Sequence, residues 1–351
     1  MIRKFTVSRD DSIYEAFPDV ALTRSGTLVC VFAECTHHGD RSYTRIMLTR
    51  SIDRGRTWSA KRPLTEPLNK ADDGLWWNCP RISTLADGRL AVVVDRCLEN
   101  ILLLSDDEGA SWSEPIGTPV YGKVPDRLVE LRYGDAAGRW VLSAHLRADE
   151  AGGDAWLQRC WVSDDQGAGW QGPFTIAADP DLMLCEGSVM ELPDGELVCF
   201  MRENSFTGLD AYKAVSRDAG RSWGSPTRFP LPACHRPVAG MLADGRVLIT
   251  HRFMPGGKGW LGWWTQNLFA AMTDVDSCLA RARDQAHARI LPIDFDRSAA
   301  ADTGYSGWVQ FDDGEVYIVN YILDDAPTAQ IRGYAVNCDD FLLPDGDGPS
   351  S

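Results

Sequence analysis

Short apolar runs separated by glycine-containing polar turns make up most of this chain. Six of these turns, each Asp-Gly or a close variant, lie between alternating apolar and polar residues, and they are centred on Gly26, Gly88, Gly138, Gly195, Gly245 and Gly314. A turn of this kind between alternating segments predicts a β-hairpin. We therefore predict six hairpins distributed along the whole chain.

A nine-residue motif recurs four times between the hairpins, as SIDRGRTWS, SDDEGASWS, SDDQGAGWQ and SRDAGRSWG, starting at Ser51, Ser105, Ser163 and Ser216. The spacings are 54, 58 and 53 residues. The serine and aspartate can hydrogen-bond the turn backbone, the glycine can adopt a positive φ, and the tryptophan can pack between neighbouring sheets. Because catalysis needs one such constellation and not four, the motif predicts a structural turn.

Repetition at this period predicts supersecondary units arranged about an axis. Six short-stranded repeats favour an all-β fold, a six-bladed β-propeller of four-stranded antiparallel blades. With no linker in the series, we predict one domain over residues 1–340 and a flexible polar tail at 341–351. A helix-like passage at 277–290 lies where the fifth blade should have its own motif, and we interpret it as an insertion.

Charge and cysteine usage exclude several classes of partner. The 351 residues include 35 basic and 50 acidic side chains, a formal net charge of −15. Such a surface repels phosphate backbones and anionic lipids, so we expect no nucleic-acid and no membrane partner. The ten cysteines occur singly within apolar runs, which predicts buried thiols, with no metal site and no cofactor. No apolar signal or spanning segment is present, which favours a cytoplasmic protein.

The hairpins also predict where a site should lie. Residues nine to eleven before each turn glycine and seven to eight after it share the rim opposite the turns. Polar residues at these places include Glu15, His145, Glu186, Arg202, Arg236, Arg252 and Tyr305. Convergent polar groups on one rim predict a ligand site, although a single charged strand end is equally typical of solvent exposure.

Tyr305 and Glu186 are a pair of residue types suited to nucleophilic catalysis. A phenol is a weak nucleophile until a carboxylate removes its proton. The planar guanidinium groups of Arg202 and Arg252 suit a substrate carboxylate.

These motifs resemble those of the sialidase superfamily, whose repeats are called Asp boxes or BNR repeats. CEGSVMELPDGELVCFMREN, RVLITHRF and DTGYSGWVQFDDGEVYIVNY are similar to family segments with catalytic and carboxylate-binding residues. The resemblance implies that Tyr305 is the nucleophile, Glu186 its base, and Arg202 and Arg252 anion clamps. The implied activity is that of a retaining exo-glycoside hydrolase acting on a terminal acidic sugar.

Two further roles come from the resemblance. Asp40, in CTHHGDRSYTR next to His37 and His38, fits the position of the family's acid/base aspartate. The family's Phe/Tyr-Arg-Ile-Pro motif is here YEAFP, which has Glu15 in place of the first arginine of a triad. Arg41, Arg81 or Arg236 can supply the missing charge. Glu15 can instead accept hydrogen bonds from sugar hydroxyls or form a salt bridge with one of those arginines.

Aromatic residues expected in loops on the same rim can stack on a sugar ring: Trp76, Trp77, Trp156, Phe206, Trp260 and Trp263. The partner predicted is a small saccharide. Two alternatives remain open. One is a glycan-acting propeller with other chemistry, such as uronide hydrolysis or elimination with His145 or Tyr305 as base. The other is a non-catalytic carbohydrate-binding propeller.

Overall fold

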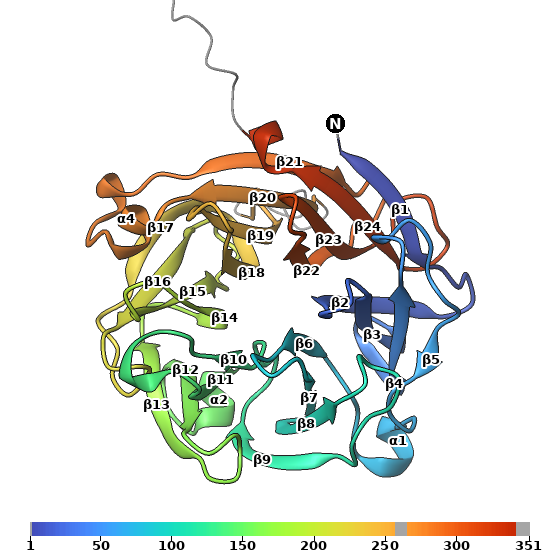
Figure 1. The fold of residues 1–351 in the computed structure, drawn as a ribbon, viewed down its shortest axis with the longest axis horizontal. Helices are drawn as coiled ribbons and strands as arrows, with labels where there is room; N and C mark the ends of the chain where they lie inside the picture. Colours follow the sequence, from blue (N-terminus) through green and yellow to red (C-terminus); the bar gives the residue numbers. More distant parts are fainter. Residues whose placement is uncertain (1, 257–264, 342–351) are drawn as a thin grey trace, which may run out of the picture.

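The computed structural model describes residues 2–256 and 265–341. Six four-stranded antiparallel sheets surround a central axis, with the first strand of each sheet innermost (Figure 1). This confirms the predicted all-β six-bladed propeller. Of the tail predicted at 341–351, Phe341 is buried at the end of a 3-10 turn, and the rest, like Trp260 and Trp263, lies outside the described residues.

The strands of the first three blades are β2 (Tyr14–Leu22), β3 (Leu28–His37), β4 (Asp40–Ser51) and β5 (Arg62–Pro63); β6 (Arg81–Thr84), β7 (Leu90–Arg96), β8 (Glu99–Ser105) and β9 (Ile116–Tyr121); and β10 (Val129–Glu130), β11 (Trp140–Leu146), β12 (Trp156–Ser163) and β13 (Gln171–Asp179). The remaining strands are β14 (Leu184–Glu191), β15 (Leu197–Glu203), β16 (Asp210–Ser216) and β17 (Thr227–Pro232); β18 (Cys234–Met241), β19 (Val247–Phe253), β20 (Asn267–Thr273) and β21 (Arg289–Phe295); and β22 (Thr303–Gln310), β23 (Glu315–Ile322) and β24 (Gln330–Asn337).

The sixth blade takes its outermost strand from the opposite end of the chain. Strand β1 (Arg3–Ser8) pairs antiparallel with β24, so the order in that sheet is β1-β24-β23-β22. Lys4 forms an ion pair with Asp294 of the fifth blade, which strengthens this junction. The ring is therefore closed by main-chain hydrogen bonds between residues near the two ends of the chain, a pairing that the local sequence pattern did not predict.

The four repeated motifs form the same turn after the third strand of each of the first four blades. In each, the serine Oγ accepts a hydrogen bond from the glycine N–H, at 2.8 Å in three copies and 2.9 Å in the fourth. Gly55 has φ +79°, and a Cβ there would lie 2.2 Å from the Tyr317 ring, so a glycine is required. The motif is explained by turn geometry alone.

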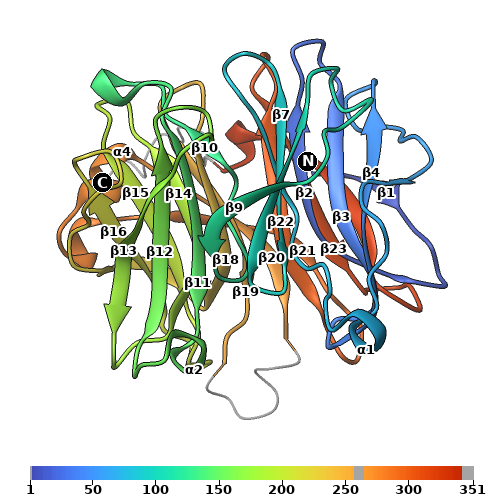
Figure 2. The same ribbon diagram turned by 90° about the horizontal axis from the view of Figure 1, so that it is seen from below.

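These turns and the hairpin turns share one rim. Ser25, in the first hairpin turn, donates its N–H to Oε1 of Glu108 in the second motif at 3.0 Å. Figure 2 shows the blades from the side, with their loops in two separate rims. The opposite rim is thus left for the ends of strands that carry the candidate site residues.

The helices are short: α1 (Lys70–Asp73), α2 (Ala148–Ala151) and α4 (Val275–Leu279), with 3-10 turns η1 (Gly134–Ala136), η2 (Arg283–Gln285) and η3 (Cys338–Phe341). The helix-like passage predicted at 277–290 forms only part of α4, then η2 and the start of β21. It does connect the third and fourth strands of the fifth blade, where the first four blades have the repeated turn. The position of the insertion is confirmed, but its helix is shorter than predicted.

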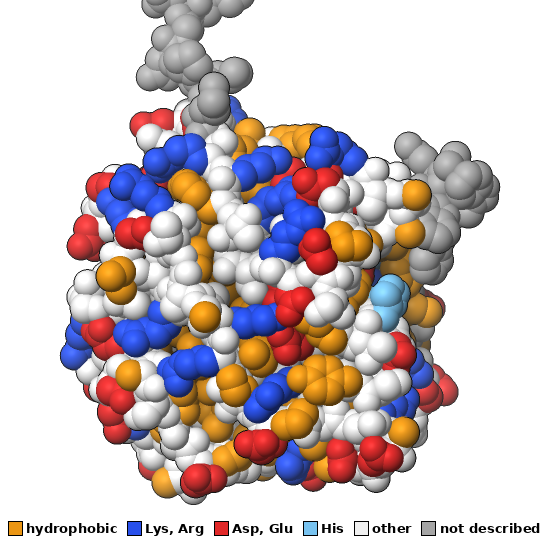
Figure 3. All heavy atoms as spheres, turned by 90° about the vertical axis from the view of Figure 1, so that its right-hand side faces the viewer, with side chains coloured by type: hydrophobic (Ala, Val, Ile, Leu, Met, Phe, Trp, Pro, Cys, Tyr) orange, Lys and Arg blue, Asp and Glu red, His pale blue; other side chains and the backbone are white. Residues whose placement is uncertain are grey.

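The distribution of surface charges and the burial of the cysteines agree with what the composition predicts. Acidic and basic side chains are interspersed over the side of the ring shown in Figure 3. All ten cysteines are free, and nine of them are buried. Within residues 2–256 and 265–341, none of the helices is long and apolar enough to cross a membrane.

Candidate active site

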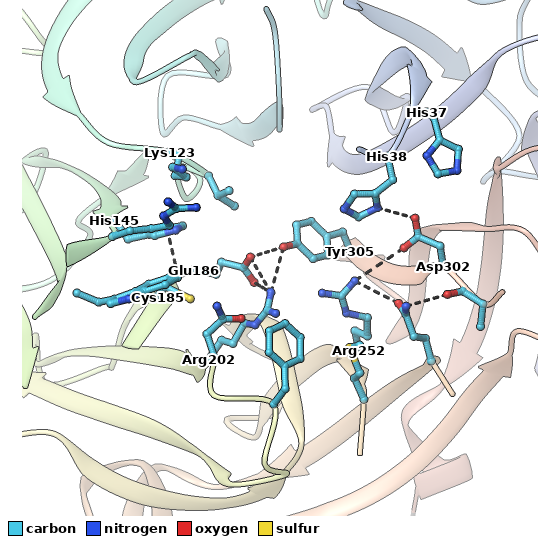
Figure 4. A pocket seen from close by; sticks show the side chains of 18 of the residues that line it. His37, His38, Lys123, His145, Cys185, Glu186, Arg202, Arg252, Asp302 and Tyr305 are labelled. Carbon is cyan, nitrogen blue, oxygen red and sulfur yellow. Dashed lines mark hydrogen bonds and ion pairs between the residues drawn. The ribbon is translucent and has the colours of Figure 1, made fainter. Parts of the chain in front are cut away.

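A cavity of about 610 Å³ opens on the rim opposite the repeated turns. Side chains from blades one, three, four, five and six line it, including six predicted site residues: His37, His145, Glu186, Arg202, Arg252 and Tyr305. The register count from the hairpin glycines identified five of these six, all but His37, although they are far apart in sequence. Figure 4 shows most of them pointing toward a common centre.

The centre of the cavity is a hydrogen-bonded group of three side chains. The Tyr305 hydroxyl donates to Oε1 of Glu186. Nη1 of Arg202 lies 2.9 Å from each Glu186 oxygen and 3.4 Å from the Tyr305 hydroxyl. All three side chains are buried. The phenol is thus held against a carboxylate that can accept its proton.

The charge state of this group follows from its surroundings. Burial would raise the pKa of Glu186, but the charges of Arg202 and Arg252 outweigh it and lower the pKa to about 2. Burial and the Glu186 charge raise the pKa of Tyr305 well above its usual value. Glu186 is therefore ionised and Tyr305 neutral at neutral pH, so this carboxylate is able to accept a proton from the phenol.

Backbone bulges place these side chains at the cavity. The pairing of β14 with β15 shifts register between Cys185 and Ser188, and Glu186 there has φ +50°. Strand β22 has a similar shift between Thr303 and Ser306, next to Tyr305. A bulge redirects a side chain from the regular alternation of a strand, and here it directs the residue to the open end of the axis.

Arg252, from the fifth blade, lies beside Tyr305. Its guanidinium carbon is 5.0 Å from the centre of the Tyr305 ring, and Nη1 is 3.2 Å from Oε1 of Gln266. Gly304 makes this packing possible, because a Cβ there would lie 2.4 Å from Cβ of Arg252. Arg202 and Arg252 thus present two guanidinium groups on the same side of the Tyr305 hydroxyl (Figure 4).

His145 and two aromatic residues form the other walls. The His145 ring stacks on Trp156 at 6.0 Å between centroids, and its Nδ1 accepts a hydrogen bond from the Glu186 N–H at 3.4 Å. Burial lowers the pKa of His145 to about 4, so it is neutral near pH 7. Phe206 lies 5.2 Å from the Arg202 guanidinium. Of the six aromatic residues predicted near this rim, Trp156 and Phe206 line the cavity, and Trp76 and Trp77 do not.

A partly buried carboxylate that sequence reasoning did not single out completes the cavity. Asp302 accepts hydrogen bonds from the hydroxyls of Tyr14 and Tyr321 and is paired with Nδ1 of His38. It directly precedes β22, three residues before Tyr305. Counting residues from the hairpin glycines did not select Asp302, because it lies outside the range of nine to eleven residues before Gly314.

Four predicted binding residues lie outside the cavity lining. Glu15 is fully buried and accepts hydrogen bonds from Lys61 at 2.7 Å and Ser8 at 2.8 Å. It lies two residues before Phe17, which has φ +57° within the bulge of β2. At the place where other blades present Glu186 and Arg236, the first blade therefore presents an aromatic ring. Glu15 does not oppose an anion in this cavity.

Arg81, Arg236 and Trp77 are also buried beneath or beside the cavity. Nη1 of Arg81 donates to the Ser306 carbonyl at 3.0 Å, and Nη2 of Arg236 donates to the Pro125 carbonyl at 2.8 Å. Nε1 of Trp77 donates to the Glu66 carbonyl at 2.9 Å. The two guanidinium groups thus join inner strands and loops of different blades. Arg41, the third possible replacement for the triad arginine, lies over the Phe17 ring at 5.4 Å.

Asp40 is likewise outside the cavity lining. It begins β4, is exposed, and accepts hydrogen bonds from the N–H of Ser42 at 2.8 Å and from the Ser42 hydroxyl. These bonds lower the pKa of Asp40, the opposite of what a proton donor needs. Among the described residues, no three His, Cys, Asp or Glu side chains are placed to hold a metal ion.

Comparison with known proteins agrees with this architecture. A family model for the BNR repeat-like domain matches residues 91–318. The chain belongs to the BNR repeat-like domain family. No curated protein sequence matched the chain. As a BNR repeat-like protein it is a sialidase-like propeller, which confirms the family resemblance given by its motifs.

Solved structures of other propellers share the fold at low identity. A protein of unknown function from Dyadobacter fermentans DSM 18053 is 21% identical with a TM-score of 0.75, over 95% of this chain and 98% of that one. The Hadza microbial sialidase Hz136 is 19% identical, TM-score 0.67, over 94% of this chain and 66% of its own. The intramolecular trans-sialidase from Ruminococcus gnavus is 13% identical, TM-score 0.71, over 94% and 96%. At these identities the similarity establishes the fold of the BNR protein. Its chemistry must be inferred from the residues of the cavity.

Proposed function

We propose that this protein is a retaining exo-glycoside hydrolase that removes a terminal acidic sugar, with Tyr305 as nucleophile and Glu186 as its base. The single observation that carries the proposal is the Tyr305 hydroxyl bonded to an ionised Glu186 while Arg202 and Arg252 lie beside it in one cavity. A neutral phenol approaches an anomeric carbon beside a carboxylate without the repulsion that an anionic nucleophile would meet.

The arginines suit the acidic group of such a sugar. Without substrate, Nη1 of Arg202 is bonded to both Glu186 oxygens. A bound carboxylate would share that positive charge, which would raise the pKa of Glu186 and make it a stronger base for the Tyr305 proton. Substrate binding would thus activate the nucleophile. Glu15 does not weaken this arrangement, because it is paired with Lys61 away from the cavity.

The proposed substrate is small. Solved structures that share the fold include sialidases and trans-sialidases, which supports a sialic acid or a related acidic sugar as the first candidate. Trp156 and Phe206 offer flat apolar faces for the ring.

A panel of aryl glycosides of sialic, other nonulosonic and uronic acids tests the proposal. We expect turnover of an acidic α-glycoside with the first-formed product retaining the anomeric configuration, observed by NMR. Inversion, or an unsaturated product from elimination, would contradict the proposed chemistry. Saturable binding without turnover, unchanged in Tyr305→Phe, would instead indicate a carbohydrate-binding propeller.

A further inference from the structure

The proposed reaction also needs a group that protonates the leaving oxygen, and the cavity offers few candidates. The carboxylates that line it in residues 2–256 and 265–341 are Glu186 and Asp302. Glu186 is committed to Tyr305 and Arg202. Asp40 is exposed and bonded to Ser42, outside the lining.

Asp302 is held as an anion. Its Oδ1 accepts a hydrogen bond from the Tyr321 hydroxyl at 2.7 Å, and Oδ2 accepts from the Tyr14 hydroxyl and pairs with His38. Nη1 of Arg252 lies 3.9 Å from Oδ1. Burial would raise the pKa of Asp302, but these partners outweigh it and lower the pKa. Asp302 therefore has no proton to give, but it is rigidly placed to orient a neighbour.

That neighbour is His38, in the turn between β3 and β4. Its Nδ1 is bonded to Oδ2 of Asp302, so a neutral ring has its proton on Nδ1 and its lone pair on Nε2. The side chain is 40% exposed, and the ring lies edge-on to Phe17 at 5.2 Å. The same Phe17 ring is 5.4 Å from Tyr305. Figure 4 shows His38 on the Tyr305 side of Asp302, facing the cavity.

In this arrangement a carboxylate orients an imidazole, and the imidazole can exchange protons with a group bound in the cavity. Within the described parts of the chain, Nε2 of His38 has no hydrogen-bond partner, so it is available to a substrate oxygen or a water molecule. We propose that His38 is the general acid and base of this hydrolase and that Asp302 is its positioning residue. This inference rests on the proposed function.

The proposed reaction has two half-reactions. In the first, the Tyr305 oxygen bonds to the anomeric carbon and its proton passes to Glu186. The glycosidic C–O bond breaks, and the leaving oxygen takes the Nε2 proton of the His38 imidazolium. In the second, neutral Nε2 accepts a proton from water as the water oxygen bonds to the anomeric carbon. The Tyr305–carbon bond breaks, and the phenolate recovers its proton from Glu186.

The test compares leaving groups. For His38→Gln we expect kcat/KM to fall roughly 10²–10⁴-fold for a glycoside with a poor alkyl leaving group, the usual contribution of general acid catalysis. With a nitrophenyl leaving group, which departs without a proton, the fall in kcat/KM should be much smaller. Asp302→Asn should show the same selectivity in weaker form. His287→Gln is the matched control, because His287 is 73% exposed and pairs with Asp274 outside the cavity.

A second measurement separates the half-reactions. A fluorinated acidic sugar with fluoride as leaving group needs no acid to label the enzyme, but release of the adduct needs a base. We expect His38→Gln to be labelled and to lose the adduct far more slowly than the unaltered protein. Exogenous azide should restore release, because an anionic nucleophile needs no base.

The outcomes distinguish this inference from the proposed function. If the unaltered protein turns over no acidic glycoside, the proposed function fails and the inference fails with it. If it is active but His38→Gln lowers kcat/KM equally for both leaving groups, the inference alone is refuted. The same holds if Asp40→Asn, and not His38→Gln, shows the selectivity.

Discussion

The two rims of this propeller are built on the same strands and behave differently. On the rim of the repeated turns, four copies make the same hydrogen bond within 0.1 Å, from a glycine N–H to a serine hydroxyl at 2.8 or 2.9 Å. On the cavity rim, equivalent bulges carry Phe17, Glu186 and Arg236, and no two of these side chains have the same environment. Repetition thus marks the residues that build the ring, and divergence at equivalent positions marks those that can perform chemistry.

The largest effect should come from the cavity rim. Tyr305→Phe removes the nucleophilic oxygen and leaves the ring that packs on Phe17 and Arg252. We expect kcat/KM to fall roughly 10³-fold or more, the order of loss when a nucleophile is removed from a covalent mechanism. Steady-state kinetics on the best aryl glycoside measure it. A melting transition well above the assay temperature is the control for folding, and undiminished turnover would remove Tyr305 from the mechanism.

Glu186 should make stability depend on acid. Its pKa is lowered to about 2 in the folded protein, below the ordinary value of 4.5, so its stabilisation is complete above about pH 4.5 and is lost as pH falls toward 2. Relative to Glu186→Gln, the interactions of ionised Glu186 with Arg202, Arg252 and its other partners should together contribute up to roughly 3 kcal/mol near neutral pH.

Denaturant unfolding of both proteins between pH 7 and pH 2.5 measures this difference. We expect the stability advantage of the unaltered protein to shrink steadily below pH 4.5. A difference that stays constant with pH would mean that Glu186 is not held ionised by Arg202 and Arg252.

Arg252 should matter for acidic substrates more than for neutral ones. Arg252→Lys keeps the charge but loses the planar fork of donors. Hydrogen bonds to charged groups contribute about 1.5–3 kcal/mol, so we expect KM for an acidic glycoside to rise roughly 10- to 100-fold. A substrate whose carboxylate is replaced by a primary amide should show a smaller change in KM. Equal changes for both substrates would exclude a direct contact of Arg252 with the acidic group.

The turn rim should give the smallest effect and no catalytic one. Ser51→Ala leaves the buried Gly55 N–H without the hydroxyl that it contacts at 2.8 Å, at a cost of about 1–3 kcal/mol in unfolding free energy. Ser216→Ala, which removes the matching 2.9 Å contact to Gly220, should cost the same. We expect kcat/KM to stay unchanged in both variants at a temperature where they are folded. A selective loss of turnover in either would give this rim a functional role.

The comparison also explains what the sequence could predict. Hairpin glycines and repeated turns are local signals, so six blades and the Glu186, Arg202, Arg252 and Tyr305 cluster followed from counting residues. Counting did not reveal the bulge in β2. Because of this bulge, Phe17 occupies the rim position, and Glu15 lies in a buried pair with Lys61.

Long-range pairings were beyond such a count. The closure of the ring by β1 and β24 joins residues more than 300 positions apart. The pair of His38 and Asp302 spans 264 positions and depends on the first and sixth blades being neighbours in the ring. Arg81 and Arg236 have the charge expected of anion ligands. Because they are buried, their guanidinium groups instead donate to backbone carbonyls of other blades and loops.

The central claim is that Tyr305, activated by Glu186, bonds to the sugar. Its most direct test is mass spectrometry of the protein after reaction with a fluorinated acidic sugar that has fluoride as leaving group. The account predicts one added glycosyl group per chain, located on the peptide that contains Tyr305, and none in Tyr305→Phe. An adduct on another residue, or turnover of the same sugar by Tyr305→Phe at the unaltered rate, would contradict it.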